Sequence, residues 1–308
     1  MAAFPTGEAL RGLGHRLARL ASGDSFHDEA HHFWDHGAAD EGENRYWAAQ
    51  PLVRRAINRR ITGDPDRWPM DWFRRRFAPE PFEVGLSAGC GDGGLERDVL
   101  SKDICRTIEG IDFSEGALAR ARSLAEEAGL AGRARYRTAN LDALALRAES
   151  YDVVFFHGSL HHTREVDAVL ATAERALKPN GILFVDEYMG PSREEWSDAL
   201  WRFARAAFEA LPEDLKNRPE LAIPLPMDDP SESVRSSRIR PAVAERFELL
   251  EDRPYGGNIL WFVFPCLDMR ALREDRTRAL SRLIAFEDHL LENGWAESYF
   301  RMMIARKK

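Results

Sequence analysis

The sequence is poor in cysteine. Only three of its 308 residues are cysteines, Cys90, Cys105 and Cys266. None of them forms a C-x-x-C pair, and an odd number leaves one cysteine without a partner. This composition suits a reducing compartment better than a secreted disulfide framework, so we expect a cytoplasmic location.

Long apolar runs and an excess of positive charge are also missing. No apolar stretch approaches the roughly 20 residues that a bilayer-spanning helix needs. The net charge is −8, which provides no overall field that would attract nucleic acid. We therefore expect neither a membrane nor a nucleic-acid partner, and a small molecule as the substrate.

What the chain does contain is an apolar run that breaks into glycines at residues 84–94, ahead of a helix-compatible segment. Such a strand, loop and helix N-terminus lets a ligand lie against the backbone, where a Cβ atom would collide. Asp112 ends the next strand-like run, 19 residues after Gly93, and could accept hydrogen bonds from a ribose. The two features predict a nucleoside-binding α/β site. The glycine spacing alone also fits a dinucleotide-binding loop.

From residue 82 the pattern strand, loop, helix repeats without an internal sequence repeat, which predicts a mostly parallel sheet. We predict strands near residues 84–87, 107–111, 134–140, 151–156, 181–185, 247–251 and 299–305, with helices at 114–130, 165–177 and 273–293. The domain would span residues 81–308, after a helical cap at 1–80. A proline-rich, aromatic insertion at 190–244 is expected to form a lid or substrate wall.

The N-terminal cap carries two patterns with alternative interpretations. An apolar stripe with arginines between its members resembles a transit peptide: Leu10, Leu13, Leu17 and Leu20. Glu8 and the scarcity of serine favour a packed helix instead. Histidines one helical turn apart have the spacing of a metal site: His27, His31, His32 and His36. No further ligand pair accompanies them, so we predict a solvated or lid-forming helix and no metal.

Several separated motifs together resemble class I S-adenosylmethionine-dependent methyltransferases over about residues 80–190. They are the Gly-x-Gly-x-Gly loop from Gly89, the acid Asp112, the pair Asn140 and Leu141, the Leu-His-His of residues 160–162 and the Leu-Lys-Pro-Asn-Gly of residues 177–181. The resemblance implies a Rossmann-like, mostly parallel seven-stranded sheet and S-adenosyl-L-methionine as the cofactor. Ser87 departs from the family, which usually has an acid there that helps to hold the methionine amino group.

The resemblance also implies which residues contact the cofactor. These are Gly89, Cys90, Gly91, Gly93, Asp112, Phe113, Asn140, Leu141 and His157. An NAD-dependent oxidoreductase, the competing interpretation of the glycines, does not account for the Leu-His-His and Lys-Pro-Asn-Gly motifs.

Catalytic residues follow from topology, because ligands lie at the carboxyl ends of parallel strands. His161 lies beyond the 151–156 strand and Glu187 beyond the 181–185 strand. A histidine oriented by a carboxylate suits a general base, and the pair resembles the one in small-molecule and sugar O-methyltransferases. His157 and His162 are the next candidates, and local packing of these histidines is the alternative.

We therefore predict a methyltransferase that acts on a hydroxyl of a sugar or natural product. Methylation of an amine, which needs no dedicated base, is one alternative. A non-catalytic binding protein with the same fold is another, although glycines and Asp112 serve a ligand rather than packing. Apolar surface in the cap would suit a lid or a homodimer equally well.

Overall fold

The computed structural model describes residues 47–222, 229–268, 270–271 and 277–308. In this part of the chain seven strands form one sheet in the order β3-β2-β1-β4-β5-β7-β6. The strands are β1 (Phe82–Ala88), β2 (Cys105–Asp112), β3 (Ala134–Thr138), β4 (Tyr151–His157), β5 (Leu177–Tyr188), β6 (Phe247–Gly256) and β7 (Phe300–Lys307). Pairs among β1 to β5 are parallel, and β7 is antiparallel to both neighbours. The predicted α/β sheet is confirmed.

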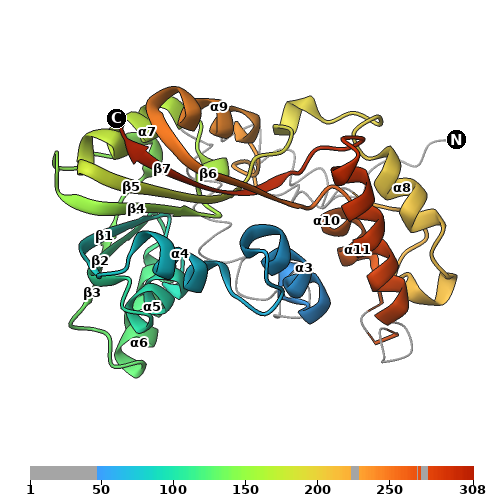
Figure 1. Ribbon diagram of the computed structural model, residues 1–308, viewed down its shortest axis with the longest axis horizontal. Helices are drawn as coiled ribbons and strands as arrows, with labels where there is room; N and C mark the ends of the chain where they lie inside the picture. The colour runs from blue at the N-terminus through green and yellow to red at the C-terminus, as the bar shows by residue number, and fades with distance from the viewer. Residues whose placement is uncertain (1–46, 223–228, 269, 272–276) are drawn as a thin grey trace, which may run out of the picture.

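Helices cover both faces of this sheet, as Figure 1 shows, with α4, α5 and α6 below it and α7 and α9 above it. Their bounds are α3 (Pro51–Thr62), α4 (Pro69–Phe77), α5 (Gly94–Ser101), α6 (Glu115–Glu127), α7 (Val166–Ala176), α8 (Arg202–Glu209), α9 (Ser236–Arg246), α10 (Leu260–Val263) and α11 (Thr277–Glu292). None of the helices in the described part of the chain combines the length and apolar character that a membrane span requires. The leucine stripe and the four N-terminal histidines lie outside the described residues.

Alternate residues of the central strands pack against different helical layers. Phe155 of β4 and Phe184 of β5 point to the α4 side, where the ring of Phe73 meets them at centroid distances of 6.0 and 5.2 Å. Their neighbours Val154 and Val185 belong to the opposite core, which α7 and α9 close. Helix α4, although it lies in the predicted cap, therefore forms part of the layer that covers the sheet.

Local signals set the ends of two helices. The Ser114 hydroxyl accepts a hydrogen bond from the amide of Ala117 at 3.1 Å and caps α6, as predicted. Helix α7 ends at Ala176 and β5 begins at Leu177; Asn180, near the start of this strand, has a left-handed φ of 62°. Because parallel pairs join β2, β1, β4 and β5, the carboxyl ends of β2 and β5 lie at the same edge of the sheet.

The region 190–244, predicted as an insertion, contains two different parts. Helix α8 and its flanking aromatic residues pack beside α10, where the Trp196 ring lies 5.3 Å from that of Phe262. Helix α9 packs on α7 and buries Ile239 and Val243 in the core above the sheet. The last part of the region therefore covers the sheet, and a lid role for the remainder stays a prediction.

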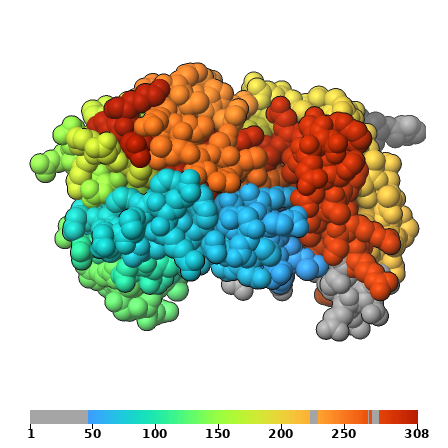
Figure 2. Space-filling view, in the orientation of Figure 1, coloured from blue at the N-terminus to red at the C-terminus, as the bar shows by residue number. Residues whose placement is uncertain are grey.

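A second group of helices, α3, α8, α10 and α11, extends beyond the edge of the sheet. Arg60 of α3 joins two of them by donating to Glu287 of α11 at 2.6 Å. In the space-filling view α3, in blue, lies directly against the red C-terminal helix (Figure 2). This contact brings residues from both ends of the described chain together.

Candidate active site

The glycine loop follows β1 and ends at the first residue of α5. Gly89 and Gly91 have φ values of 76° and 53°, which disfavour residues with a Cβ atom. A Cβ on Gly89 would lie 2.4 Å from Cβ of Ser159, whereas one on Gly91 would point into open space. Gly91 lines the cleft, so its bare backbone leaves room for a ligand there.

Asp112 ends β2 beside this loop, as predicted. Its Oδ2 accepts a hydrogen bond from the Gly91 amide at 2.8 Å, and its Oδ1 accepts one from the Ser114 amide at 2.9 Å. These bonds fix the orientation of the carboxylate. Because each carboxylate oxygen can accept more than one hydrogen bond, the side chain can still receive the hydroxyls of a ribose.

One cleft of about 720 Å³ contains most of the predicted cofactor residues. Gly89, Cys90, Gly91, Asp112, Phe113, Asn140, Leu141 and His157 all line it, together with His162. Gly93 does not; it precedes α5, and a Cβ there would lie 2.6 Å from the Tyr136 hydroxyl. Burial raises the pKa of the Cys90 thiol, so this residue lines the cleft as a neutral group.

His161 and Glu187 meet just behind the cleft rather than in its wall. Nδ1 of His161 lies 2.6 Å from Oε2 of Glu187. The other Glu187 oxygen accepts hydrogen bonds from the amides of Ser159 and Leu160, both at 2.7 Å. Burial raises the pKa of Glu187, but His161 and these amides outweigh it and hold that pKa below its ordinary value. The predicted pair therefore exists, with an ionised carboxylate.

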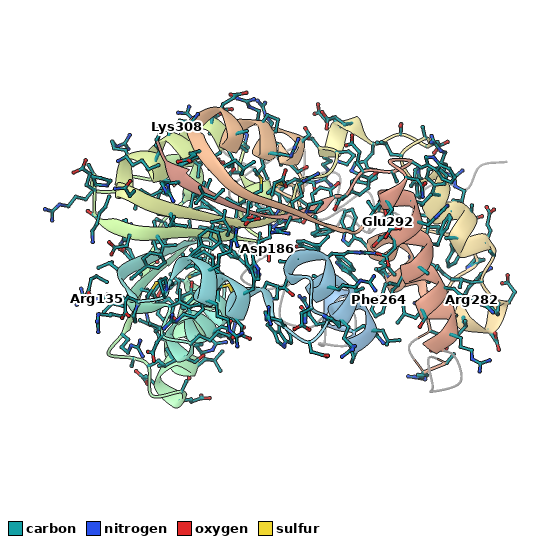
Figure 3. All side chains as sticks on the ribbon, in the orientation of Figure 1. Arg135, Asp186, Phe264, Arg282, Glu292 and Lys308 are labelled. Carbon is teal, nitrogen blue, oxygen red and sulfur yellow. The ribbon has the colours of Figure 1, made fainter. Side chains whose placement is uncertain are left out.

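The remaining predicted histidines, His157 and His162, have different neighbours. His157 ends β4 with half of its side chain exposed, and its Nε2 is 3.7 Å from Oδ2 of Asp186. Asp186 lies near the middle of the molecule (Figure 3) and accepts a hydrogen bond from the Tyr255 hydroxyl at 2.6 Å. His162 stacks beside His161, with ring centroids 4.1 Å apart.

Three functional groups near the histidines were not predicted: Asp229, Ser231 and Glu232. Oε1 of Glu232 lies 3.8 Å from Nε2 of His161, and its Oε2 lies 3.9 Å from Nε2 of His162. The Ser231 hydroxyl lies 3.0 Å from Nδ1 of His162. The Asp-Pro-Ser-Glu run of residues 229–232 was the feature of the sequence that could have indicated these residues, but its composition is typical of a surface turn.

These carboxylates set the protonation of the two imidazoles. Burial opposes a charge on His161, but Glu232, Glu187 and Asp229 outweigh it and raise its pKa to about 9. Burial and the neighbouring His161 lower the pKa of His162 to about 4. At neutral pH His161 is thus the protonated, positively charged imidazole and His162 the neutral one, unless another positive charge enters the cleft.

A second unpredicted carboxylate, Glu96, lies in the first turn of α5. It is fully buried, and neither of its oxygens makes a well-formed hydrogen bond with another described residue. Burial raises the pKa of Glu96 to about 7, although the interaction with Ser87 lowers it. Ser87 itself lines the cleft at the position where an acid was expected.

Comparison with known proteins points to one family. Residues 86–185 match the sequence profile described as "Methyltransferase domain". A ubiquinone biosynthesis O-methyltransferase of Hahella chejuensis is 32% identical over 169 residues, which is 54% of this chain and 60% of that protein. One of Sinorhizobium medicae is 34% identical over 100 residues, 32% of this chain and 39% of that protein. The chain thus matches less than two thirds of the length of either relative.

Solved structures agree on the fold. The phosphoethanolamine N-methyltransferase 2 of Haemonchus contortus in complex with S-adenosyl-L-methionine superimposes with a TM-score of 0.52 and 15% identity, over 90% of this chain and 59% of that one. A geranyl diphosphate methyltransferase superimposes with a TM-score of 0.50 and 15% identity, over 88% of this chain and 93% of that one. The fold is therefore the Rossmann-like fold of class I methyltransferases.

Residues 86–185 thus match a methyltransferase domain, and the sheet has the fold of the class I S-adenosylmethionine-dependent methyltransferases. The lining of the cleft is compatible with S-adenosylmethionine. Gly91 and Gly158 line it, both with positive φ, and no atom of the described residues lies within 4 Å of the position that a Cβ would take. Asp112 lies beside them as the predicted partner of the ribose.

Proposed function

We propose that this chain transfers the methyl group of S-adenosylmethionine to a hydroxyl of a small molecule, such as a sugar or natural product. The observation that carries the proposal is that one cleft is lined both by the glycine loop with Asp112 and by His162, the neighbour of the His161–Glu187 pair. The O-methyltransferase names of the relatives at 32–34% identity support the choice of oxygen.

The cofactor supplies a methyl group on a sulfonium, so the protein must mainly position the acceptor in line with it. We assign cofactor contacts to Gly89, Cys90, Gly91, Phe113, Asn140, Leu141 and His157, with Asp112 on the ribose and Gly93 supporting the loop from behind. These assignments rest on the lining of the cleft and on the family resemblance.

We propose His161, oriented by Glu187, as the group that takes the proton from the acceptor hydroxyl. A neutral imidazole is needed for this step. Because the surrounding carboxylates raise the pKa of His161 to about 9, it becomes a base only when positive charge in the cleft offsets them. The cofactor is a cation, and its charge acts in that direction. His162, which lines the cleft, and His157 are the next candidates.

Calorimetric titration with S-adenosylmethionine, S-adenosylhomocysteine and NAD tests the cofactor site. We expect wild type to bind the first two and not NAD. Asp112→Ala should weaken both about 10- to 100-fold, because a hydrogen bond to a charged group is lost. Asp198→Ala, on an exposed side chain, is the matched control and should bind normally. Binding of NAD instead, or unchanged affinity in Asp112→Ala, would contradict the proposed site.

The acceptor atom is tested by turnover with panels of hydroxyl and amine compounds. For O-methylation, His161→Gln and Glu187→Gln should reduce kcat about 100-fold or more while the affinity for S-adenosylhomocysteine stays the same. Amines methylated equally well by both variants would favour N-methylation. Cofactor binding without turnover on either panel would favour the non-catalytic alternative.

A further inference from the structure

The cluster formed by His161, His162 and Glu232 has the composition of a transition-metal site. One ligand atom from each of the three side chains lies within 4.8 Å of the other two. Both imidazoles turn Nε2 toward the Glu232 carboxylate, at 3.8 and 3.9 Å. These distances are too long for hydrogen bonds. Ligands that share an ion at about 2.1 Å stand roughly 3.4 Å apart. The two contacts to Glu232 would therefore have to shorten by about half an ångström, and the separation of the two imidazole nitrogens, which is within 4.8 Å, by at most about 1.4 Å.

Nδ1 of each imidazole already has a polar partner, as the second ring nitrogen of a metal-ligating histidine usually does. Nδ1 of His161 contacts Glu187 at 2.6 Å, and Nδ1 of His162 contacts the Ser231 hydroxyl at 3.0 Å. That hydroxyl in turn donates to Asp229 at 2.6 Å. Histidines that ligate metals usually donate their other ring N–H to such a group, which fixes the tautomer and leaves Nε2 as the donor to the metal.

The charge of the cluster also calls for a cation. Glu187 and Asp229 are fully buried and Glu232 is 13% exposed. Among the described residues, their ion pairs are with His161 and His162 alone. Two imidazolium rings 4.1 Å apart repel each other, so protonation of both histidines is a poor way to neutralise three carboxylates. Within the described part of the chain, Oδ2 of Asp229 accepts no hydrogen bond.

We propose that His161, His162 and Glu232 bind one divalent first-row transition metal ion at the edge of the cofactor cleft. Two imidazoles and one carboxylate favour ions such as Zn²⁺, Fe²⁺ or Co²⁺ over Mg²⁺ or Ca²⁺, which prefer oxygen ligands. Three protein ligands leave positions for exogenous oxygen, and His162 is the ligand that lines the cleft. The acceptor hydroxyl would reach the ion from that side.

This inference rests on the proposed function only for the role of the ion. A bound ion lowers the pKa of a coordinated hydroxyl, so it would take over the activation assigned above to His161, which then acts as a ligand. Metal binding itself needs neither the cofactor nor an acceptor. The two proposals can therefore fail separately.

Co²⁺ is the probe, because its visible absorption changes when protein ligands replace its water ligands and alter its coordination geometry. The chelator-treated full chain is titrated with Co²⁺, alongside a variant in which His27, His31, His32 and His36 are alanine, since those histidines could bind metal themselves. We expect the variant to bind one Co²⁺ per chain, displaceable by Zn²⁺. In that background Glu232→Gln should lose the absorption band, while Asp229→Asn should weaken binding about 10- to 100-fold.

His289→Ala removes an exposed histidine on α11 and should leave Co²⁺ binding unchanged. Retained affinity for S-adenosylhomocysteine shows that Glu232→Gln is folded. The absence of Co²⁺ binding in the four-histidine background, or an unchanged band in folded Glu232→Gln, would overturn the metal site whatever the cofactor titrations give. Turnover that survives full chelation would overturn the role of the ion in activating the hydroxyl.

Discussion

Single buried side chains decide much of the chemistry in this protein, and Glu96 is the clearest case outside the histidine cluster. Its carboxyl interacts with Ser87, with the Cys90 thiol and with the hydroxyl of Tyr136. Arg97 is the cation that favours its ionised form, and Asp92 opposes it. Desolvation dominates, so the pKa of about 7 is well above the ordinary value.

Stability should therefore depend on pH through Glu96. The native state keeps this proton up to about pH 7, whereas the unfolded chain releases it near pH 4.5. The stabilisation is present below the unfolded pKa and is lost as pH rises through the folded pKa, by about 3 kcal/mol in total. Urea unfolding from pH 5 to 8 should show wild type losing stability relative to Glu96→Gln. Parallel curves for the two proteins would contradict the prediction.

The sequence predicts those residues whose role depends on the local backbone conformation. Gly89 and Gly91 must accommodate positive φ, and Asp112 must end a strand. Glu96 and Glu232 could not be predicted, because an acid in a charged helix or a polar turn usually faces solvent. Only the tertiary contacts with Ser87 and with the two histidines reveal them.

The order and type of most elements followed from periodicity, whereas their ends did not. Strand β5 continues to Tyr188 because β7 pairs with it through Asp186 and Glu187, beyond the apolar run. Helix α6 ends at Glu127, before the predicted Leu130. Helix α9 was missed because Pro241 stands inside it and prolines usually mark loops. Pairing with a distant strand and burial against α7 override these local signals.

The contact between α3 and α11 depends on a buried ion pair. Glu287 is fully buried, accepts hydrogen bonds from the amides of Gly257, Ile259 and Leu260, and pairs with Arg60. Glu287→Gln removes one of the two carboxylates that pair with Arg60, because Asp288 also accepts a hydrogen bond from its Nε at 2.8 Å, and it removes the negative charge that accepts the amide hydrogen bonds. The free energy of unfolding should therefore fall by about 1.5–3 kcal/mol.

The matched control is Asp66→Asn, which breaks the exposed pair with Arg55 and should cost less than about 1 kcal/mol. Urea unfolding of both variants measures the difference. Equal losses in the two variants would show that burial of the Arg60–Glu287 pair does not matter.

In the whole molecule one core joins the sheet to the outer helices. Ile57 of α3, Phe262 of α10 and Leu283 of α11 belong to the same buried cluster as Phe155 of β4. Unfolding the outer helices would expose the underside of the sheet. The chain should therefore unfold in a single calorimetric transition.

S-adenosylhomocysteine should move that transition upward as a whole, by about 2.7 kcal/mol of stabilisation at a ligand concentration 100 times Kd. Two transitions, of which the ligand moves only one, would show instead that the outer helices are a separate cooperative unit.

Ser159 contacts both the glycine-loop side of the cleft and the His161–Glu187 pair. Its hydroxyl donates to the carbonyl of Ala88 at 2.6 Å, its amide donates to Glu187, and its Cβ lies against Gly89. A mutation of this serine should therefore disturb both the glycine loop and Glu187. Residues 229–232 approach the histidines from a distant part of the sequence. Substitutions at Ser231 or Glu232 would therefore change the surroundings of His161 and His162 directly.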